Sequence, residues 1–189
     1  MQNNKPFINV GMVGHVSNGK TTLVKCLTNV NTKRDSSEIK SGKTIKLGYA
    51  NCIIWKCGIC NGIKTSGQSE KCINCCGFPS EQEQYISFID APGHHSYVQT
   101  MIKGTAIIDC AIVVTDVRAN ELQAQTLEHL AILEVLNVHN VIVVQNKIDL
   151  VSSEQCKDNY YMLKKELKGT VAENSPIIPI SAQSNINID

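Results

Sequence analysis

The chain has 189 residues, of which 42% are hydrophobic, and a formal net charge of +1 at pH 7. This length and apolar content predict one generous domain, or one domain with a small insertion, around a sizeable core. The near-neutral charge argues against a surface that binds polyanions in bulk, so any nucleic-acid contact must come from local patches. The sequence has no apolar run long enough to span a membrane, and its first residues, MQNNKPF, lack the apolar stretch of a signal peptide. We therefore expect a soluble, cytoplasmic protein with no membrane partner.

The first apolar run, Phe7–Val13, predicts a buried strand, and Thr22–Leu27 predicts a helix from its apolar spacing. Between them, Gly14–Thr21 fits the pattern GxxxxGK[ST], in which backbone N–H groups and the helix N-terminus converge on phosphate oxygens. Lys20 would reach the β- and γ-phosphates of a nucleotide, and the Thr21 hydroxyl would bind Mg²⁺. The alternative is a glycine-rich turn that binds no ligand. The nucleotide-binding residues predicted in this segment are Val16, Ser17, Asn18, Gly19, Lys20, Thr21 and Thr22.

Residues 31–50 are polar and predict a mobile loop, and residues 51–80 interrupt the α/β pattern as a small insertion. The insertion holds two CxxC pairs, which in an intracellular chain favour a metal site over disulfides. Four thiolates favour tetrahedral Zn²⁺ in a closed structural site, a zinc knuckle. Cys76 is an alternative to Cys75 as the fourth ligand, and a reduced loop without metal is the alternative to the whole site. The predicted Zn²⁺ ligands are Cys57, Cys60, Cys72 and Cys75.

The next predicted strand, Tyr85–Ile89, ends in the sequence DAPGH. Asp90, at the strand end, would hold the water shell of Mg²⁺. Gly93 would bring its backbone N–H close to the γ-phosphate. His94 is the candidate for orienting the attacking water, and it is the predicted catalytic residue.

The predicted strand Val141–Val144 ends in the sequence QNKID. Asp149 can accept two hydrogen bonds from the N1–H and the 2-amino group of guanine, whereas adenine would leave the carboxylate unpaired. Asn146 would touch the N7 edge of the base and tie back to the glycine-rich loop, while the stem of Lys147 would cover the ring. The alternative is an exposed turn that reads NKID by chance.

The last predicted strand, Ile177–Ile180, continues into Ser181, Ala182 and Gln183. A backbone N–H in this segment could donate to guanine O6, and that of Ala182 is the candidate. The non-alternating Ile and Val runs suit strands buried on both faces. Helical segments are predicted near 95–105, 123–137 and 153–168. This βαβα alternation predicts a doubly wound, mostly parallel α/β sheet of the P-loop GTPase type, with its ligand beyond the carboxyl ends of the strands. Catalysis in such a protein would be mostly positioning and electrostatics.

Taken together, the motifs carry a family resemblance. The chain combines GHVSNGKT, TIKLGYAN over residues 44–51, the cysteine insertion, DAPGH, NKIDL, GTVAE and PIIPISAQ. This set resembles the gamma subunits of eukaryotic and archaeal translation initiation factor two. The loop and NKID are shared by all translational GTPases, so TIKLGYAN with the cysteine insertion is the more specific part. The resemblance covers residues 1–189, but only as the GTP-binding domain of that subunit, and the two β-barrel domains that follow it in the family are absent from this chain.

The resemblance implies a slow GTPase that binds GTP or GDP with Mg²⁺ and relies on an activating partner. Thr44 would lie in the first switch loop and bind Mg²⁺ in the GTP state, and Asp90 to His94 would open the second switch. The complete factor would carry initiator methionyl-tRNA to the small ribosomal subunit. Its implied partners are the alpha and beta subunits, a GTPase-activating factor and a nucleotide-exchange factor.

The sequence also departs from the family pattern. Ser17-Asn18 stands where many relatives in the wider class have Asp-His, Lys43 stands where an apolar gate residue is usual, and the segment Asn120–Gln123 is shorter than expected. A selenocysteine-specific or other tRNA-carrying elongation GTPase is the nearest alternative. Two further alternatives are a nucleotide-gated switch with negligible turnover of its own and a cysteine finger that binds nucleic acid.

Overall fold

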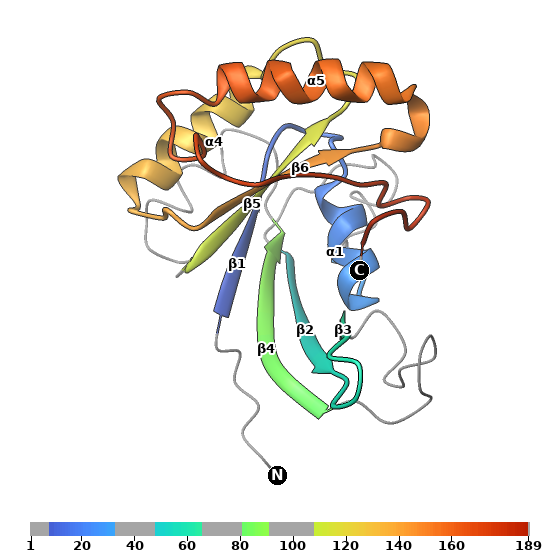
Figure 1. The fold of residues 1–189 in the computed structure, drawn as a ribbon. Helices are drawn as coiled ribbons and strands as arrows, with labels where there is room; N and C mark the ends of the chain where they lie inside the picture. Colours follow the sequence, from blue (N-terminus) through green and yellow to red (C-terminus); the bar gives the residue numbers. More distant parts are fainter. Residues whose placement is uncertain (1–7, 33–47, 66–80, 91–107, 189) are drawn as a thin grey trace.

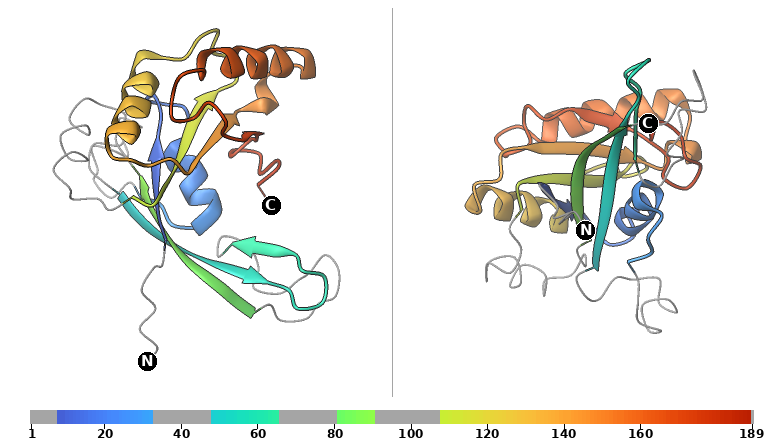
Figure 2. Two further views of the ribbon diagram at one scale, coloured as in Figure 1. Left: turned by 60° about the vertical axis from the view of Figure 1, so that its left-hand side comes forward. Right: turned by 90° about the horizontal axis from the view of Figure 1, so that it is seen from below.

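The computed structural model describes residues 8–32, 48–65, 81–90 and 108–188, which form a twisted sheet with helices on both of its faces (Figures 1 and 2). Within these residues the sheet has seven strands in the order β3-β2-β4-β1-β5-β6-β7. The predicted doubly wound, mostly parallel α/β architecture is therefore confirmed. The elements are β1 Ile8–Val13, α1 Lys20–Thr28, β2 Gly48–Lys56, β3 Ile63–Thr65, β4 Glu81–Asp90, β5 Cys110–Asp116, α4 Ala124–Val135, β6 Val141–Asn146, the 3-10 turn η1 Ile148–Leu150, α5 Ser153–Glu166 and β7 Ile177–Pro179.

The central strands are parallel, and this places their carboxyl ends along one edge of the sheet. β1 lies between β4 and β5, β5 pairs with β6, and β6 pairs with β7, all in parallel. Met12 is level with Asp90, and Asp116 is level with Asn146. Polar residues that are far apart in sequence are thus brought to the same edge, where ligands of open α/β sheets bind.

Strand β2, which lies between β3 and β4, includes the first residues that the sequence assigned to the insertion. Residues 51–56, assigned to the insertion from the sequence, continue β2, which pairs antiparallel with β4 along its whole length. Buried and exposed residues alternate from Gly48 to Cys52, as in a strand with one covered face. The Cys52 thiol donates to the carbonyl oxygen of Leu27 on α1 (3.5 Å). The cysteines and glycines after Lys56 obscured this alternation, so only residues beyond β2 remain candidates for an insertion.

The helices pack two hydrophobic clusters against the two faces of the sheet. α1 covers one cluster, in which Leu23 and Val24 lie against the strands. α4 and α5 cover the other, in which Leu133 and Leu163 are completely or almost completely buried. α5 begins with a capping box, in which Ser152 and Gln155 exchange side-chain and backbone hydrogen bonds.

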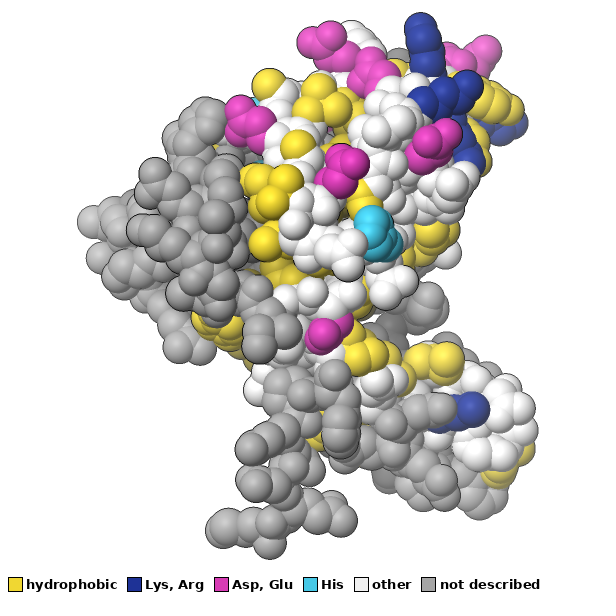
Figure 3. Space-filling model, turned by 90° about the vertical axis from the view of Figure 1, so that its left-hand side faces the viewer, with side chains coloured by type: hydrophobic (Ala, Val, Ile, Leu, Met, Phe, Trp, Pro, Cys, Tyr) yellow, Lys and Arg dark blue, Asp and Glu magenta, His cyan; other side chains and the backbone are white. Residues whose placement is uncertain are grey.

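The helices predicted over 123–137 and 153–168 are confirmed as α4 and α5, while the helix predicted near 95–105 lies outside the described residues. α4 turns Thr126, Leu130 and Leu133 inward and leaves Leu127 exposed. Figure 3 shows the side of the molecule on which α4 lies, where exposed hydrophobic side chains stand among acidic ones and Lys and Arg gather at one end. In the described part of the chain, no helix has both the length and the apolar character needed to cross a bilayer.

We predict that Leu133→Ala lowers the free energy of unfolding by about 2–5 kcal/mol, because it opens a cavity in a fully buried cluster. Leu127→Ala makes the same change on the same helix at a side chain that is 43% exposed, and it should cost about 1 kcal/mol or less. Urea unfolding of both variants measures the difference. Equal losses would contradict the packing of α4 seen here.

Candidate functional site

The backbone of the glycine-rich loop between β1 and α1 leaves no room for side chains at two of its glycines. Gly14, Ser17 and Gly19 have positive φ angles of 128°, 67° and 99°. A Cβ atom on Gly14 would lie 2.3 Å from the carbonyl oxygen of Val114, and one on Gly19 would lie 2.3 Å from Nδ2 of Asn146. Both glycines are therefore required by φ and by close neighbours from other strands.

Lys20 is a buried cation at the start of α1. Its Nζ donates to the carbonyl oxygens of Gly14 and His15, at 2.8 Å each, and the residue is only 6% exposed. Burial lowers the pKa of Lys20 to about 8, against a smaller upward effect of the nearby Asp90 carboxylate. An anion at this helix N-terminus would compensate the buried charge, so the loop fits a phosphate group.

Oxygen ligands gather beside Lys20 at the end of β4. Asp90 is fully buried, and its Oδ2 accepts hydrogen bonds from the hydroxyls of Thr21 (2.7 Å) and Thr32 (2.6 Å). A carboxylate and hydroxyls are the hard oxygen donors that Mg²⁺ prefers. The pair Thr21 and Asp90, predicted as Mg²⁺ ligands, therefore fits this ion by its chemistry.

Asn146, at the end of β6, joins three segments at the other end of the site. Its Nδ2 donates to the carbonyl oxygen of Asn18 in the loop (2.8 Å). Its Oδ1 accepts from the backbone N–H groups of Lys147 (2.8 Å) and Ala182 (3.1 Å). The expected hydrogen bond between Asn146 and the loop is present, and the hydrogen bond from the Ala182 N–H fixes the orientation of the Asn146 side chain. Ser181 is buried next to it, while Gln183 is exposed.

Lys147 and Asp149 follow Asn146 on a sharp turn. Lys147 has a φ of 69°, and its Nζ donates to the carbonyl oxygen of Ser17 (2.8 Å), so its side chain reaches across to the loop. Asp149, in the one-turn helix η1, is exposed and open to solvent. The arrangement leaves the Asp149 carboxylate accessible to a ligand held beside Lys147.

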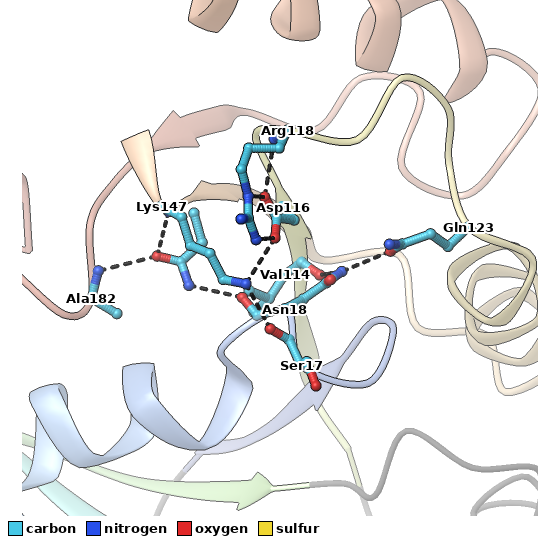
Figure 4. A network of polar contacts seen from close by, with 9 residues as sticks. Ser17, Asn18, Val114, Asp116, Arg118, Gln123, Lys147 and Ala182 are labelled. Atoms are coloured by element: carbon cyan, nitrogen blue, oxygen red, sulfur yellow. Dashed lines mark hydrogen bonds and ion pairs between the residues drawn. The ribbon is translucent and has the colours of Figure 1, made fainter. Parts of the chain in front are cut away.

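Several residues that the sequence did not single out take part in this site (Figure 4). Asp116, at the end of β5, forms an ion pair with Lys147 (2.7 Å) and another with Arg118 (2.7 Å). The side chain of Asn18 donates to Gln123 on the loop before α4 (3.0 Å), and the N–H of Gly14 donates to Nδ1 of the buried His129 (3.1 Å). A search of every strand exit for polar residues would have found Asp116, because it follows the buried run of β5. Nothing local to Gln123 or His129 marks them.

The cysteine pair nearest the sheet lies on the turn between β2 and β3. Cys57 is buried and Cys60 is exposed, and the N–H of Gly62 donates to the Cys60 sulfur (3.4 Å). No group of three or more metal-binding side chains occurs within the residues that the structure describes.

Seven residues of the sequence-based hypotheses lie outside the described residues: Lys43, Thr44, Cys72, Cys75, Cys76, Gly93 and His94.

Comparison with known proteins assigns this geometry to a family. A family model described as the elongation factor Tu GTP binding domain matches residues 5–189. The chain belongs to this GTP-binding domain family. It is 48% identical over 185 residues to translation initiation factor 2 subunit gamma of Methanosarcina mazei, covering 98% of this chain and 43% of the relative. The same subunit of Aeropyrum pernix is 46% identical over 188 residues, covering 98% of this chain and 45% of the relative.

The chain thus spans less than half the length of the curated relatives it matches. The predicted resemblance to the initiation factor gamma subunit is confirmed, and so is the prediction of a GTP-binding domain of the elongation factor Tu family. Among solved structures, a bacterial selenocysteine-specific elongation factor matches with a TM-score of 0.74 at 27% identity, covering 97% of this chain and 27% of that one. Elongation factor SelB of Methanococcus maripaludis with the GTP analogue GPPNHP matches with a TM-score of 0.67 at 29% identity, covering 98% of this chain and 32% of that one.

The pKa of Lys20 makes a prediction for nucleotide binding. At pH 8 about half of the free protein carries a neutral Lys20, whereas bound phosphates favour the ammonium, so binding should take up about half a proton. The part of the uptake due to Lys20 should approach zero near pH 6, where Lys20 is already charged, and the affinity should fall as the pH rises above 8. Calorimetry in buffers of different ionisation enthalpy measures this uptake.

The control for this measurement is Lys25→Met, which removes an exposed lysine from the same helix and should leave the proton uptake unchanged. An uptake that is independent of pH between 6 and 9 would contradict the low pKa of Lys20.

Proposed function

We propose that this chain is the GTP-binding and GTP-hydrolysing domain of a cytoplasmic translation initiation factor. The observation that carries the proposal is the hydrogen bond from Asn146 to the carbonyl oxygen of Asn18. It joins the turn Asn146–Asp149, which is predicted to bind the guanine base, to the glycine-rich loop Gly14–Thr21, which is predicted to bind the phosphates. The identity to initiation factor gamma subunits is higher than the identity to the two elongation factors of known structure, and this supports initiation over elongation. In the complete factor, the domain would work with alpha and beta subunits, an activating factor and an exchange factor, and would help carry initiator methionyl-tRNA to the small ribosomal subunit.

The phosphate end of the site would bind and orient the nucleotide. Lys20 would turn its ammonium from the carbonyl oxygens of Gly14 and His15 to the β- and γ-phosphates, and the first turn of α1 would donate backbone N–H groups. Thr21 and Asp90 would hold Mg²⁺, with Thr44 from the first switch. Mg²⁺ held by these residues would neutralise the negative charge that develops on the phosphates during transfer. Gly93 would contact the γ-phosphate, and His94 would orient the attacking water.

The base end of the site would select guanine. Asn146 is fixed by its three hydrogen bonds, and Asp149 remains exposed beside it. The Asp149 carboxylate would accept from N1–H and the 2-amino group of guanine, with Lys147 over the ring. Adenine lacks this pair of donors, so binding ATP would leave a desolvated carboxylate unpaired.

A second candidate function is that of a selenocysteine-specific or other tRNA-carrying elongation GTPase. The similarity of the fold to a bacterial selenocysteine-specific elongation factor and to elongation factor SelB favours it. The full-length protein separates the two functions, because an initiation factor should bind initiator methionyl-tRNA in its GTP form in preference to selenocysteinyl-tRNA. The rate of single-turnover GTP hydrolysis, measured with and without ribosomal complexes, distinguishes a slow GTPase from a nucleotide-gated switch with negligible turnover of its own.

We predict that GDP and GTP displace a fluorescent GDP analogue from this chain, whereas ATP competes at least about 100-fold less well. Asp149→Asn should shift the preference toward xanthosine diphosphate, because the amide offers a donor to the carbonyl that xanthine has in place of the 2-amino group. Asp158→Asn, at an exposed carboxylate on α5, is the matched control and should keep guanine selectivity. Equal displacement by ATP would reject guanine binding, and an unshifted Asp149→Asn variant would reject the base-reading role.

We also propose that Cys57, Cys60, Cys72 and Cys75 form a structural Zn²⁺ site. The turn after β2 supports this for the first pair. The Asn61 N–H donates to the Cys57 carbonyl oxygen (2.9 Å), and the Gly62 N–H donates to the Cys60 sulfur, which would stabilise a thiolate. Four thiolates would leave no open position for water, so the metal would stabilise the fold and take no part in hydrolysis.

Elemental analysis of protein purified under reducing conditions should find about one zinc per chain. Cys57→Ser should lose most of it, since one ligand of a closed site is removed. Cys156→Ser changes a half-buried cysteine on α5 and should retain the metal. Zinc-free wild-type protein would reject the site.

A further inference from the structure

Asp116 is a buried carboxylate at the predicted base end of the site, and it is held on several sides. Only 8% of the residue is exposed. Its Oδ1 accepts from the backbone N–H and the Nε of Arg118, at 3.0 Å each. Its Oδ2 accepts from Nη2 of Arg118 and from Nζ of Lys147, at 2.7 Å each. The end of β5 therefore places a fixed negative charge beside the ammonium group of Lys147 (Figure 4).

We propose that Asp116 is a positioning residue for guanine-nucleotide binding, which acts by holding the Lys147 ammonium against the Ser17 carbonyl so that the lysine stem covers the base. The inference rests on the proposed binding of guanine nucleotides and adds a residue that acts through another. Asp116 would not touch the nucleotide itself.

The geometry of Lys147 shows why such a partner matters. A lysine side chain has four flexible bonds, and the loss of their rotamer entropy on ordering would otherwise weaken nucleotide binding. Two acceptors on opposite segments hold its Nζ in one place: the Ser17 carbonyl oxygen at 2.8 Å and Asp116 Oδ2 at 2.7 Å. The bond to Asp116 joins two charged groups and is the stronger kind. Without this carboxylate, the ammonium retains a neutral carbonyl and is free to leave the ring position.

Arg118 prepares Asp116 for this task. Its guanidinium contacts both carboxylate oxygens, while its own side chain is 53% exposed at the rim. Burial raises the pKa of Asp116, but the hydrogen bonds from Arg118 and Lys147 outweigh burial and hold that pKa well below its usual range. The carboxylate thus stays charged and oriented before any nucleotide arrives, so its position is set by the protein alone.

A merely structural role for Asp116 would give a different result. Asp116 also accepts a backbone hydrogen bond within its own loop, so it could serve only to shape the turn after β5. Substitution of a residue with only this role would lower the stability of the fold, and its effect on nucleotide affinity would not depend on whether Lys147 is present. Stability and coupling to Lys147 are therefore the two quantities to measure.

The first experiment compares Asp116→Asn with Asp109→Asn in the whole chain. Asp109 precedes the opposite end of β5, where its carboxylate accepts from the Asn9 N–H (2.7 Å), so the chemical change is the same but remote from the site. We expect Asp116→Asn to weaken both GDP and GTP about tenfold, the scale of one lost charge-assisted hydrogen bond, and to leave the preference for guanine over xanthine unchanged. The Asp109 variant should bind like wild type. Equal affinities of the two variants would overturn the proposal.

The second experiment is a double-mutant cycle in GDP affinity. Lys147→Met removes the ammonium and keeps an apolar stem, so adding Asp116→Asn to it should cost less than about twofold more. Adding Asp116→Asn to Asp149→Asn should multiply the two losses, because Asp149 contacts a different part of the base. A full tenfold effect of Asp116→Asn in the Lys147→Met background would show that Asp116 acts independently of Lys147 and would overturn the proposal.

Thermal unfolding of each variant accompanies the affinity measurements. If Asp116→Asn does not fold, Asp116→Glu, which keeps the charge and moves the carboxylate, replaces it in the same cycle and should show the same coupling to Lys147. Wild-type protein that fails to bind GDP would reject the proposed function. Normal GDP binding with an uncoupled Asp116 variant would reject only the positioning role.

Discussion

The hydrogen bond from the Asn146 amide to the Asn18 carbonyl oxygen is the contact on which the rest of the site depends. It connects the end of β6 with the loop after β1, two segments that lie 128 residues apart. The contact requires that Gly19 has no side chain, because a Cβ there would lie 2.3 Å from the same amide nitrogen. It places the predicted phosphate and base sites in a fixed relation, so a nucleotide would meet a site that is already assembled.

The two ends of the site differ in how their buried charges are compensated. At the base end, Asp116 is paired with two cations and has a pKa well below its usual range. At the phosphate end, Lys20 bonds to neutral carbonyl oxygens, and burial lowers its pKa to about 8 despite Asp90. A bound anion would therefore be stabilised most beside Lys20, whereas the charges at the base end already compensate one another. This asymmetry suits a ligand with phosphates at one end and an uncharged ring at the other.

The sheet makes this arrangement possible by supporting the loops from both faces. α1 seals one hydrophobic cluster and begins at the phosphate loop, while α4 and α5 seal the other cluster. Gln123 and His129, just before and within α4, bond to Asn18 and Gly14, so the packing of this helix also steadies the loop. Fold stability and loop geometry are linked in this way.

The sequence by itself determined the features that depend on neighbouring residues. The parallel strands followed from their Ile and Val runs, and the loop Gly14–Thr21 and the turn after β6 followed from short patterns whose backbone requirements are local. Only the tertiary structure revealed that residues 51–56 belong to β2 and that Asp116 pairs with Lys147. Strand pairing and ion pairs join segments distant along the chain, and no local pattern specifies which partner a buried carboxylate or an outer strand will meet.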